Sequence, residues 1–384
     1  MTAAAPPVSD AHSGRRGFAL ADIGGLPLAC SLPFMFFPKV LAGDTQPWVL
    51  ASALIALATF RVQRFVFLRD GPLLALAALC IPAFALRSES GADTFRAAYT
   101  YLSFAIFWLV CRRESGEFFA AAVKATILVW FLVGVYQYVF ISLGLPVAMA
   151  GRFVEGRSGV PSLTSEPATY GSLSLLQIMY LLGLRSARNS FFIFCAAVSI
   201  VLSGSLLAFA LLVFPLFKLP GQLRLPVVAG VLGLVAIDYS LSASGITSRV
   251  LGINQGLAGV ASLLADPSLN LRLGHLYFTM YENLLSSLLL TDRLSFMNQY
   301  NAFAQGSGIF IDTGSNYILP AVGDVIYGSG GLGALLIVLF LKASLQNCKT
   351  RSAKLQKTAF MLACMVNPIS ISNFFLILYA QQKE

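Results

Sequence analysis

Residues 191–217 read FFIFCAAVSIVLSGSLLAFALLVFPLF, an apolar stretch without a charged residue. One membrane-spanning helix needs about 20 apolar residues, so this stretch is long for one crossing and short for two. Near its middle lies the cluster Ser203-Gly204-Ser205, and glycine and serine both favour turns. We expect two helices that fold back at this cluster as a tight hairpin. A single crossing is the alternative.

Apolar residues dominate the rest of the chain as well. Hydrophobic residues make up 57% of the 384 positions and charged residues 11%, roughly half the charged share of a soluble domain. The composition predicts an all-α polytopic membrane protein with about eleven spans, within a range of about ten to twelve. Besides the hairpin, the expected spans are 20–40, 47–60, 71–86, 97–111, 120–143, 168–184, 225–240, 317–341 and 358–380.

Short basic clusters between the apolar runs predict the topology. Cytoplasmic loops are enriched in lysine and arginine. With the amino terminus inside, the inside loops hold Arg61, Arg64, Arg69, Arg112, Arg113, Arg185 and Arg188, and the hairpin keeps Lys218 and Arg224 inside as well. Residues 1–17 then form a cytoplasmic tail, and residues 18–384 form one transmembrane domain. The net charge of +9 is spread over these clusters, which argues against a nucleic-acid partner.

Two outer segments are longer than connectors, residues 144–167 and 241–315, and long loops usually carry function. In the first, Pro167 favours a helix start, Ser165 can cap that helix, and Glu166 faces its positive dipole end. On a purely structural interpretation, Glu166 offsets the dipole and pairs with Arg152 or Arg157. In the second, the region 272–290 has leucines and a methionine at helical spacing. This helix is expected either along the membrane surface or as a cap on the bundle.

The order of these motifs resembles a known family. Gly151-Arg152 through Gly159 to Ser165-Glu166-Pro167 looks like a loop of Wzy-type O-antigen and exopolysaccharide polymerases, in the O-antigen ligase and polymerase superfamily. The Ser-Gly-Ser hairpin is similar to the superfamily's Ser-Gly-Ser-Arg, with Leu206 in place of the arginine. The segment from Asp312 through Asn316 into the glycine-rich stretch 328–333 is similar to the family's final helix entry.

The resemblance implies glycosyl transfer at the external face of the bacterial inner membrane, between glycans carried on undecaprenyl diphosphate. Glu166 is the expected catalytic base and Glu155 the second candidate. Arginine forks suit a diphosphate, and no Asp-x-Asp metal signature is present, so we expect no metal and no cofactor. The expected diphosphate-binding residues are Arg152, Arg157, Arg249, Arg272 and Arg293.

Two further residues are accessory candidates, His275 and Asn316. A single histidine on a helix is more often structural than catalytic. Partners implied by the resemblance are undecaprenyl-diphosphate-linked glycans and the lipid bilayer, with a chain-length regulator and a flippase as further candidates. Two other functions remain open: a ligase that transfers the finished glycan to another acceptor, and a transporter of polysaccharide or lipid-linked sugar.

Overall fold

A computed structural model covers the chain. It describes residues 67–87, 91–111, 117–147, 159–164, 166–183, 189–218, 224–225, 227–233, 267–282, 284–289, 293–312 and 321–345, and the isolated positions 47–48, 50–51, 54, 236, 354, 357–358 and 361. Every regular element in these ranges is a helix, which confirms the predicted all-α class. The helices are α3 (Phe67–Ala85), α4 (Gly91–Cys111), α5 (Glu117–Ser142), α6 (Pro167–Gly183), α7 (Ser190–Leu202), α8 (Leu206–Lys218), α12 (Pro267–Tyr277), the π-helix η2 (Phe278–Glu282), α13 (Leu284–Leu288), α14 (Arg293–Ser307) and α15 (Ala321–Leu345).

The described helices agree with the predicted spans where the two overlap. The runs 71–86, 97–111, 120–143, 168–184 and 317–341 coincide with α3, α4, α5, α6 and α15. Two helical segments in the described part are long and apolar enough to cross a membrane, Val123–Ser142 and Val322–Leu345. The run 20–40 and the tail 1–17 lie outside the described residues, as do most of 47–60 and 358–380, whereas the run 225–240 is described, and helical, at 225, 227–233 and 236.

The segment Val123–Ser142 of α5 turns much of its apolar surface outward. In its most apolar window only 28% of the residues are buried. Val129, Leu132 and Val139 are all exposed. Soluble proteins rarely expose a large contiguous apolar patch, whereas a helix in contact with lipid does so along its length. This exposure is what a membrane-spanning α5 requires.

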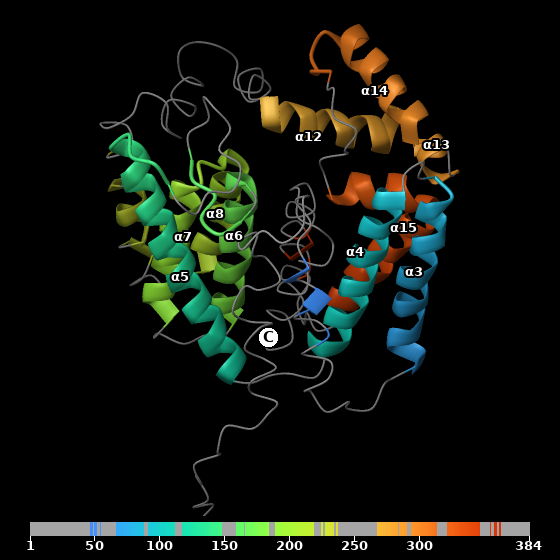
Figure 1. The fold of residues 1–384 in the computed structure, drawn as a ribbon. Helices are drawn as coiled ribbons and strands as arrows, with labels where there is room; N and C mark the ends of the chain where they lie inside the picture. Colours follow the sequence, from blue (N-terminus) through green and yellow to red (C-terminus); the bar gives the residue numbers. More distant parts are fainter. Residues whose placement is uncertain are drawn as a thin grey trace, which may run out of the picture.

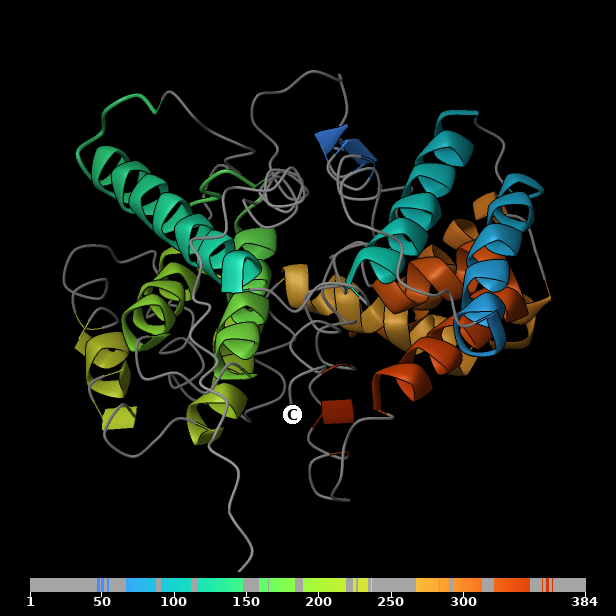
Figure 2. The same ribbon diagram turned by 90° about the horizontal axis from the view of Figure 1, so that it is seen from below.

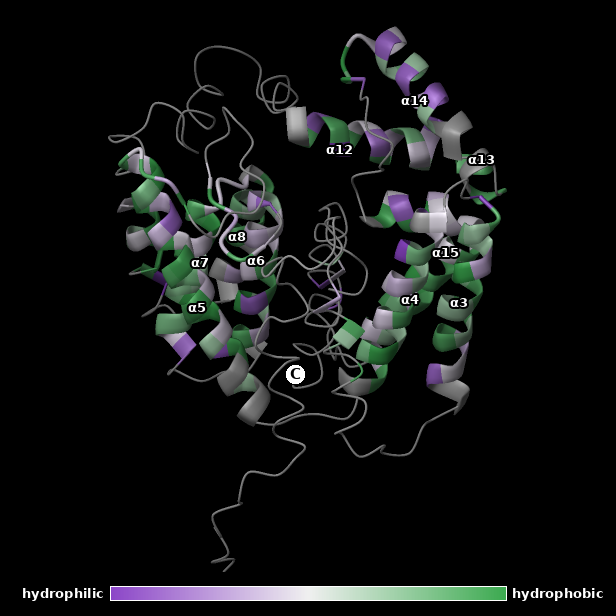
Figure 3. Ribbon diagram, viewed as in Figure 1, coloured by the Kyte–Doolittle hydropathy of each residue, from purple (hydrophilic) through white to green (hydrophobic). Residues whose placement is uncertain are grey.

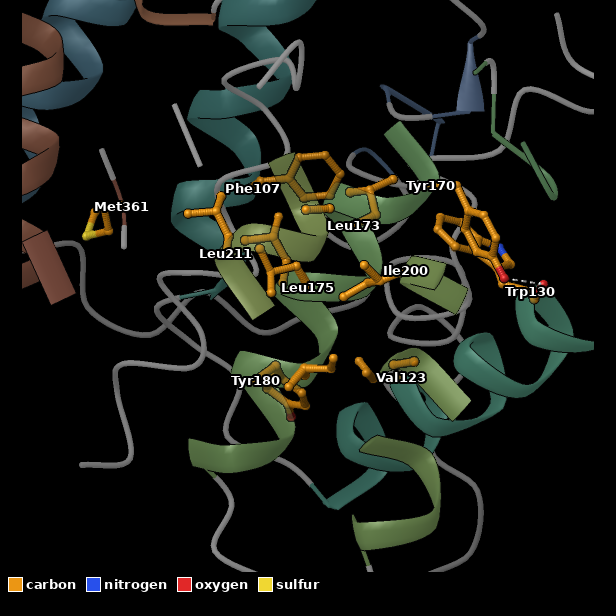
Figure 4. Close-up of a cluster of buried hydrophobic side chains, with 14 of the residues drawn as sticks. Phe107, Val123, Trp130, Tyr170, Leu173, Leu175, Tyr180, Ile200, Leu211 and Met361 are labelled. Carbon is orange, nitrogen blue, oxygen red and sulfur yellow. Dashed lines mark hydrogen bonds between the residues drawn. The ribbon is translucent and has the colours of Figure 1, made fainter. Parts of the chain in front are cut away.

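Two groups of helices lie side by side in both ribbon views (Figures 1 and 2). In the first group α6 packs against α7 and α8, and α5 packs against α7. Figure 4 shows the large side chains that fill its core, among them Trp130, Tyr170 and Leu173. Tyr170 Oη donates a hydrogen bond of 3.0 Å to the Trp130 carbonyl, and the two rings meet edge to face. The bond satisfies a hydroxyl that would otherwise be buried without a partner.

The second group consists of α3, α4 and α15. Near one end, Trp108 Nε1 donates to Asp70 Oδ1 at 3.3 Å, and the Trp108 ring lies 6.0 Å from that of Phe340. Farther along, Tyr101 Oη and Ser329 Oγ are 2.7 Å apart. Gly330 interrupts α15 with φ 61° and ψ −142°, a conformation open mainly to glycine. The sequence 328–333, rich in glycine, therefore bends this helix.

The helices α12, η2, α13 and α14, with residues 308–312, form what we call the cap. Figure 1 shows α12 lying across one end of the second group. The carboxyl ends of α5 and α3 and the amino end of α4 lie at that same end (Figure 1). The cap occupies part of the predicted outer segment 241–315, and α5 leads into the predicted outer segment 144–167. The described residues of both predicted segments therefore lie at one end of the helices.

Candidate functional site

The hairpin turn is built from buried serines. Helix α7 ends at Leu202, α8 begins at Leu206, and Gly204 between them has φ 63°. Ser203 Oγ donates to the Ile200 carbonyl at 2.7 Å and accepts from the Ser205 N–H at 3.2 Å. The predicted break at Ser203-Gly204-Ser205 is confirmed. Each of the two helices has 13 residues and is therefore about 20 Å long, shorter than the hydrocarbon core of a bilayer.

Residues 159–164 lie directly on this turn. The Val160 N–H donates to the Leu202 carbonyl at 2.9 Å. Gly159 has φ 126°, and a β-carbon at this position would overlap the Ser203 carbonyl. The structure thus brings together two motifs that are 40 residues apart in the sequence, the loop before α6 and the hairpin.

Side chains of α5 clamp the same loop from the other side. Gln137 accepts a hydrogen bond from the Ser162 N–H at 2.7 Å and donates one to the Ser162 carbonyl at 2.9 Å. Ser162 Oγ donates to the Trp130 carbonyl at 2.8 Å. Ser162 itself has φ 51°, a conformation that few residues other than glycine adopt. Because these groups are buried, their hydrogen bonds fix the loop against α5.

Glu166 occupies the residue directly before α6. Its carbonyl accepts from the Tyr170 N–H at 3.2 Å and from Thr164 Oγ1 at 2.9 Å. Its carboxylate accepts a 3.4 Å hydrogen bond from Thr169 Oγ1. The predicted helix start at Pro167 is confirmed, and a half-buried carboxylate stands at the positive end of the α6 dipole. Such a carboxylate can accept a proton from a bound hydroxyl.

The cap presents a second set of polar residues. The Asn270 side chain donates to the Ile309 carbonyl and accepts from the Ile311 N–H, both at 2.9 Å. These bonds tie α12 to the segment that follows α14. Arg272 and His275 are buried on α12, and the His275 ring lies edge to face against Tyr300 of α14, at 4.3 Å between centroids. The cap therefore holds a guanidinium and an imidazole in a packed environment.

Burial decides the charge of His275. It lowers the pKa of this histidine to about 4, so the imidazole is neutral near pH 7. The neighbouring Tyr300 donates to the Ile311 carbonyl at 3.1 Å, and burial, with Asp312, raises its pKa to about 12. Neither group supplies positive charge for a diphosphate. His275 is better placed to position α12 against α14 than to bind an anion.

Arg87 is a candidate that sequence reasoning missed. It follows α3, is 5% exposed, and its guanidinium lies 5.1 Å from the centroid of the Tyr327 ring. Tyr327 of α15 also belongs to the buried cluster that contains Phe278 and Tyr300 of the cap. Arg87 and the cap thus meet around one aromatic side chain. The sequence feature that could have indicated Arg87 is its position directly after the apolar run 71–86, where the predicted topology places the chain outside.

The other predicted residues fall in different places. Arg293 begins α14. No described hydrogen bond or ion pair joins Glu166, which precedes α6 of the first group, to Arg272, which lies on α12 of the cap. The described part also contains no group of three histidine, cysteine or carboxylate side chains arranged to hold a metal ion. Arg152, Glu155, Arg157, Ser165, Arg249 and Asn316 lie outside the described residues.

The described site contains the carboxylate of Glu166, which follows a hydrogen-bonded loop, and two buried arginines, Arg87 and Arg272, which lie beside or within the aromatic cap. Carboxylate and guanidinium groups at one end of an apolar helix bundle suit an anionic substrate that is itself anchored in a membrane. No protein family, curated protein or solved structure matches the chain.

Proposed function

We propose that this chain is a metal-independent glycosyltransferase that joins undecaprenyl-diphosphate-linked oligosaccharides into a polysaccharide at the outer face of the inner membrane. In this proposal the chain crosses the membrane about eleven times, and its amino terminus is cytoplasmic. The observation that carries the proposal is the common position of the loop before α6, the hairpin turn and the cap at one end of the helices. A chain-length regulator and a flippase are candidate partners in this proposal.

The residues have distinct roles in this reaction. The acceptor sugar hydroxyl attacks the anomeric carbon of the donor and forms the new glycosidic bond. The bond from that carbon to the diphosphate oxygen breaks, and the diphosphate leaves with the electron pair. Glu166 takes the hydroxyl proton, while Arg272 and Arg87 stabilise the charge of the leaving diphosphate. Arg157 joins them in the proposal, as do Arg152, Arg249 and Arg293 in weaker roles, and Glu155 is the second carboxylate.

The experiment measures polymer length on gels from cells that lack the native gene and express one variant. Arg272→Lys keeps the charge but loses the planar fork, so we expect a loss of roughly ten- to a hundredfold in activity. Glu166→Gln keeps the shape and removes the base, and its loss should be larger. Membrane protein level is measured for every variant. The matched control is Arg96→Lys, because the Arg96 side chain on α4 is 39% exposed and its Nη1 lies 4.0 Å from Asp93 Oδ1. Full-length polymer from normally expressed Glu166→Gln protein would remove Glu166 as the base.

One observation favours a second candidate, a carrier for lipid-linked sugar. The break at Gly330 divides α15, and carriers often use such discontinuous helices. Purified protein in liposomes with lipid-linked oligosaccharide separates the two functions. A polymerase lengthens the glycan, whereas a carrier moves it between leaflets without changing its length. A ligase leaves the glycan unchanged until a different acceptor is added.

A further inference from the structure

One side of the cap exposes a stripe of apolar side chains at a spacing of four residues. Tyr277, Tyr281, Leu285 and Leu289 are 42%, 72%, 75% and 74% exposed. They run from the end of α12 through η2 and α13 to the residue that follows α13. In an α-helix, residues spaced by four are each displaced a little further around the helix axis, always in the same direction. A π turn holds more residues than an α turn, so it displaces such residues in the opposite direction. The π-helix thus helps to hold the stripe on one side.

The opposite side of the same segment is polar and buried. His275 and Thr279 are fully buried, and Thr279 Oγ1 donates to the His275 carbonyl at 2.7 Å. Amphipathic surface helices of soluble proteins show the reverse arrangement, with polar groups outside. The leucines and the methionine at helical spacing are correspondingly not fully buried. Met280 is exposed, and the others are half-buried, namely Leu273, Leu276, Leu284 and Leu288. Apart from the exposed carboxylate of Glu282, which lies beside Tyr277, the outward side of this segment is therefore suited to an apolar medium.

The stripe continues a surface that the proposed function places in lipid. Helix α13 packs on α15, and the Leu288 carbonyl lies 3.9 Å from a β-carbon built at Gly331. One and two turns farther along, the candidate span in α15 exposes Leu335 and Val338. By contrast, α14 extends away from the bundle and carries many hydrophilic residues (Figure 3). The apolar surface thus runs from α15 onto α13, and at its α12 end Tyr277 stacks on Phe303 of α14.

We propose that this stripe lies in the outer-leaflet interface and anchors the cap to the bilayer. Leucines enter the boundary between headgroups and acyl chains, and the tyrosines lie at the headgroup level, where such rings concentrate. The anchor holds α12, and with it Arg272, at the height of lipid phosphate. The inference rests on the membrane placement within the proposed function, but not on polymerase activity.

The experiment uses full-length protein in lipid nanodiscs, with its six cysteines replaced and one cysteine added for the fluorophore NBD. The test position is Leu285→Cys. Asn298→Cys on exposed α14 is the water control, and Val338→Cys on α15 is the membrane control. Spin-labelled lipid should quench NBD at positions 285 and 338 but not at 298. Aqueous iodide should quench position 285 roughly threefold less than position 298.

The outcomes separate the two proposals. If position 338 is quenched by lipid while position 285 responds only to iodide, the anchor is wrong, and the stripe faces water, glycan or a protein partner. If position 338 also escapes lipid quenching, the membrane placement itself fails. Hydroxyl-radical oxidation of the unmodified protein provides a second measurement that requires no substitution. Lipid should protect Tyr281 to the level of buried Tyr300, and strong oxidation of Tyr281 in nanodiscs would overturn the proposal.

Discussion

The loop before α6 and the cap are both polar regions at one end of an apolar bundle, but different forces hold them. Backbone and side-chain hydrogen bonds fix residues 159–164 to the hairpin turn and to α5. The cap is held mainly by stacked rings, such as Tyr277, Phe303 and Phe310 at 5.7 to 6.0 Å. Hydrogen bonds demand one geometry, whereas ring packing tolerates small shifts.

The difference matches the chemical roles that we assign. A base must lie within hydrogen-bond distance of one proton, so Glu166 follows the rigid loop. A diphosphate has several oxygens and is mobile within the leaflet, so Arg272 can be carried by a more adaptable cap. A substitution in the loop should therefore reduce activity strongly even when it changes the geometry little, whereas the loss from a substitution in the cap should depend on the size of the change.

The largest effect is expected at Gly159. Gly159→Ala places a β-carbon against the Ser203 carbonyl at φ 126°, so either the loop or the hairpin must move. We expect a loss of about 3 to 5 kcal/mol in the free energy of unfolding, measured by chemical denaturation in detergent. Gly144→Ala is the matched control. Gly144 also has a positive φ, of 69°, but nothing lies within 4 Å, so backbone strain alone should cost about 1 to 2 kcal/mol. Equal losses would mean that the loop does not press on the hairpin.

The second effect concerns the pH dependence of the cap. The pKa of His275 is about 4 in the folded protein and about 6.5 when the histidine is exposed. Between these values the unfolded state binds a proton that the folded state does not. Stability should therefore fall as the pH drops from 6.5 to 4, by on the order of 3 kcal/mol. Hydrogen exchange of α12 amides at several pH values measures this loss.

His275→Gln should remove that dependence, while His12→Gln, at the only other histidine in the chain, should leave it intact. The same pH profile in wild-type and His275→Gln protein would show that this imidazole does not control the cap.

A smaller effect is expected from Asn270→Ala. The substitution removes two hydrogen bonds and leaves the Ile309 carbonyl and the Ile311 N–H without the amide that pairs them. Because this region is partly buried, we expect a loss of about 2 kcal/mol in cap stability by hydrogen exchange. Asn298→Ala on the exposed side of α14 should change stability by less than about 0.5 kcal/mol. If both variants behave alike, α12 is not tied to residues 309–311.

The smallest effect is expected at Thr169. Its hydroxyl lies 3.4 Å from the Glu166 carboxylate, a long and partly buried hydrogen bond. Thr169→Val should change unfolding free energy by about 0.5 kcal/mol or less and leave polymer length close to wild type. A large activity loss with unchanged stability would show that Thr169 orients Glu166 more strongly than this distance indicates.

Local patterns predicted much of the fold. Apolar runs gave the helices α3 to α6 and α15 because a helix in lipid needs little beyond length and hydrophobicity. Pro167 marked the start of α6, and Ser203-Gly204-Ser205 marked the hairpin turn. These features depend on residues that are close together in the sequence.

The tertiary contacts of the site were not predictable in the same way. The contact of Gly159 with Ser203, the Gln137 clamp and the position of Arg87 over Tyr327 all join distant segments. The region 272–290 was expected as one helix, but the structure divides it into the end of α12, η2 and α13. Helical spacing cannot reveal a π turn, because the extra residue fits the same apolar pattern.

The most direct test of the central claim, that the loop region and the cap form one outward-facing site, is labelling of single cysteines with a membrane-impermeant maleimide in intact cells. The test positions are Leu145→Cys after α5 and Gln305→Cys on α14, and the inside control is Leu225→Cys, all three exposed. One outward-facing site predicts that positions 145 and 305 are labelled from outside and that position 225 is labelled only after the cells are opened. Labelling of positions 145 and 305 from opposite sides would contradict it.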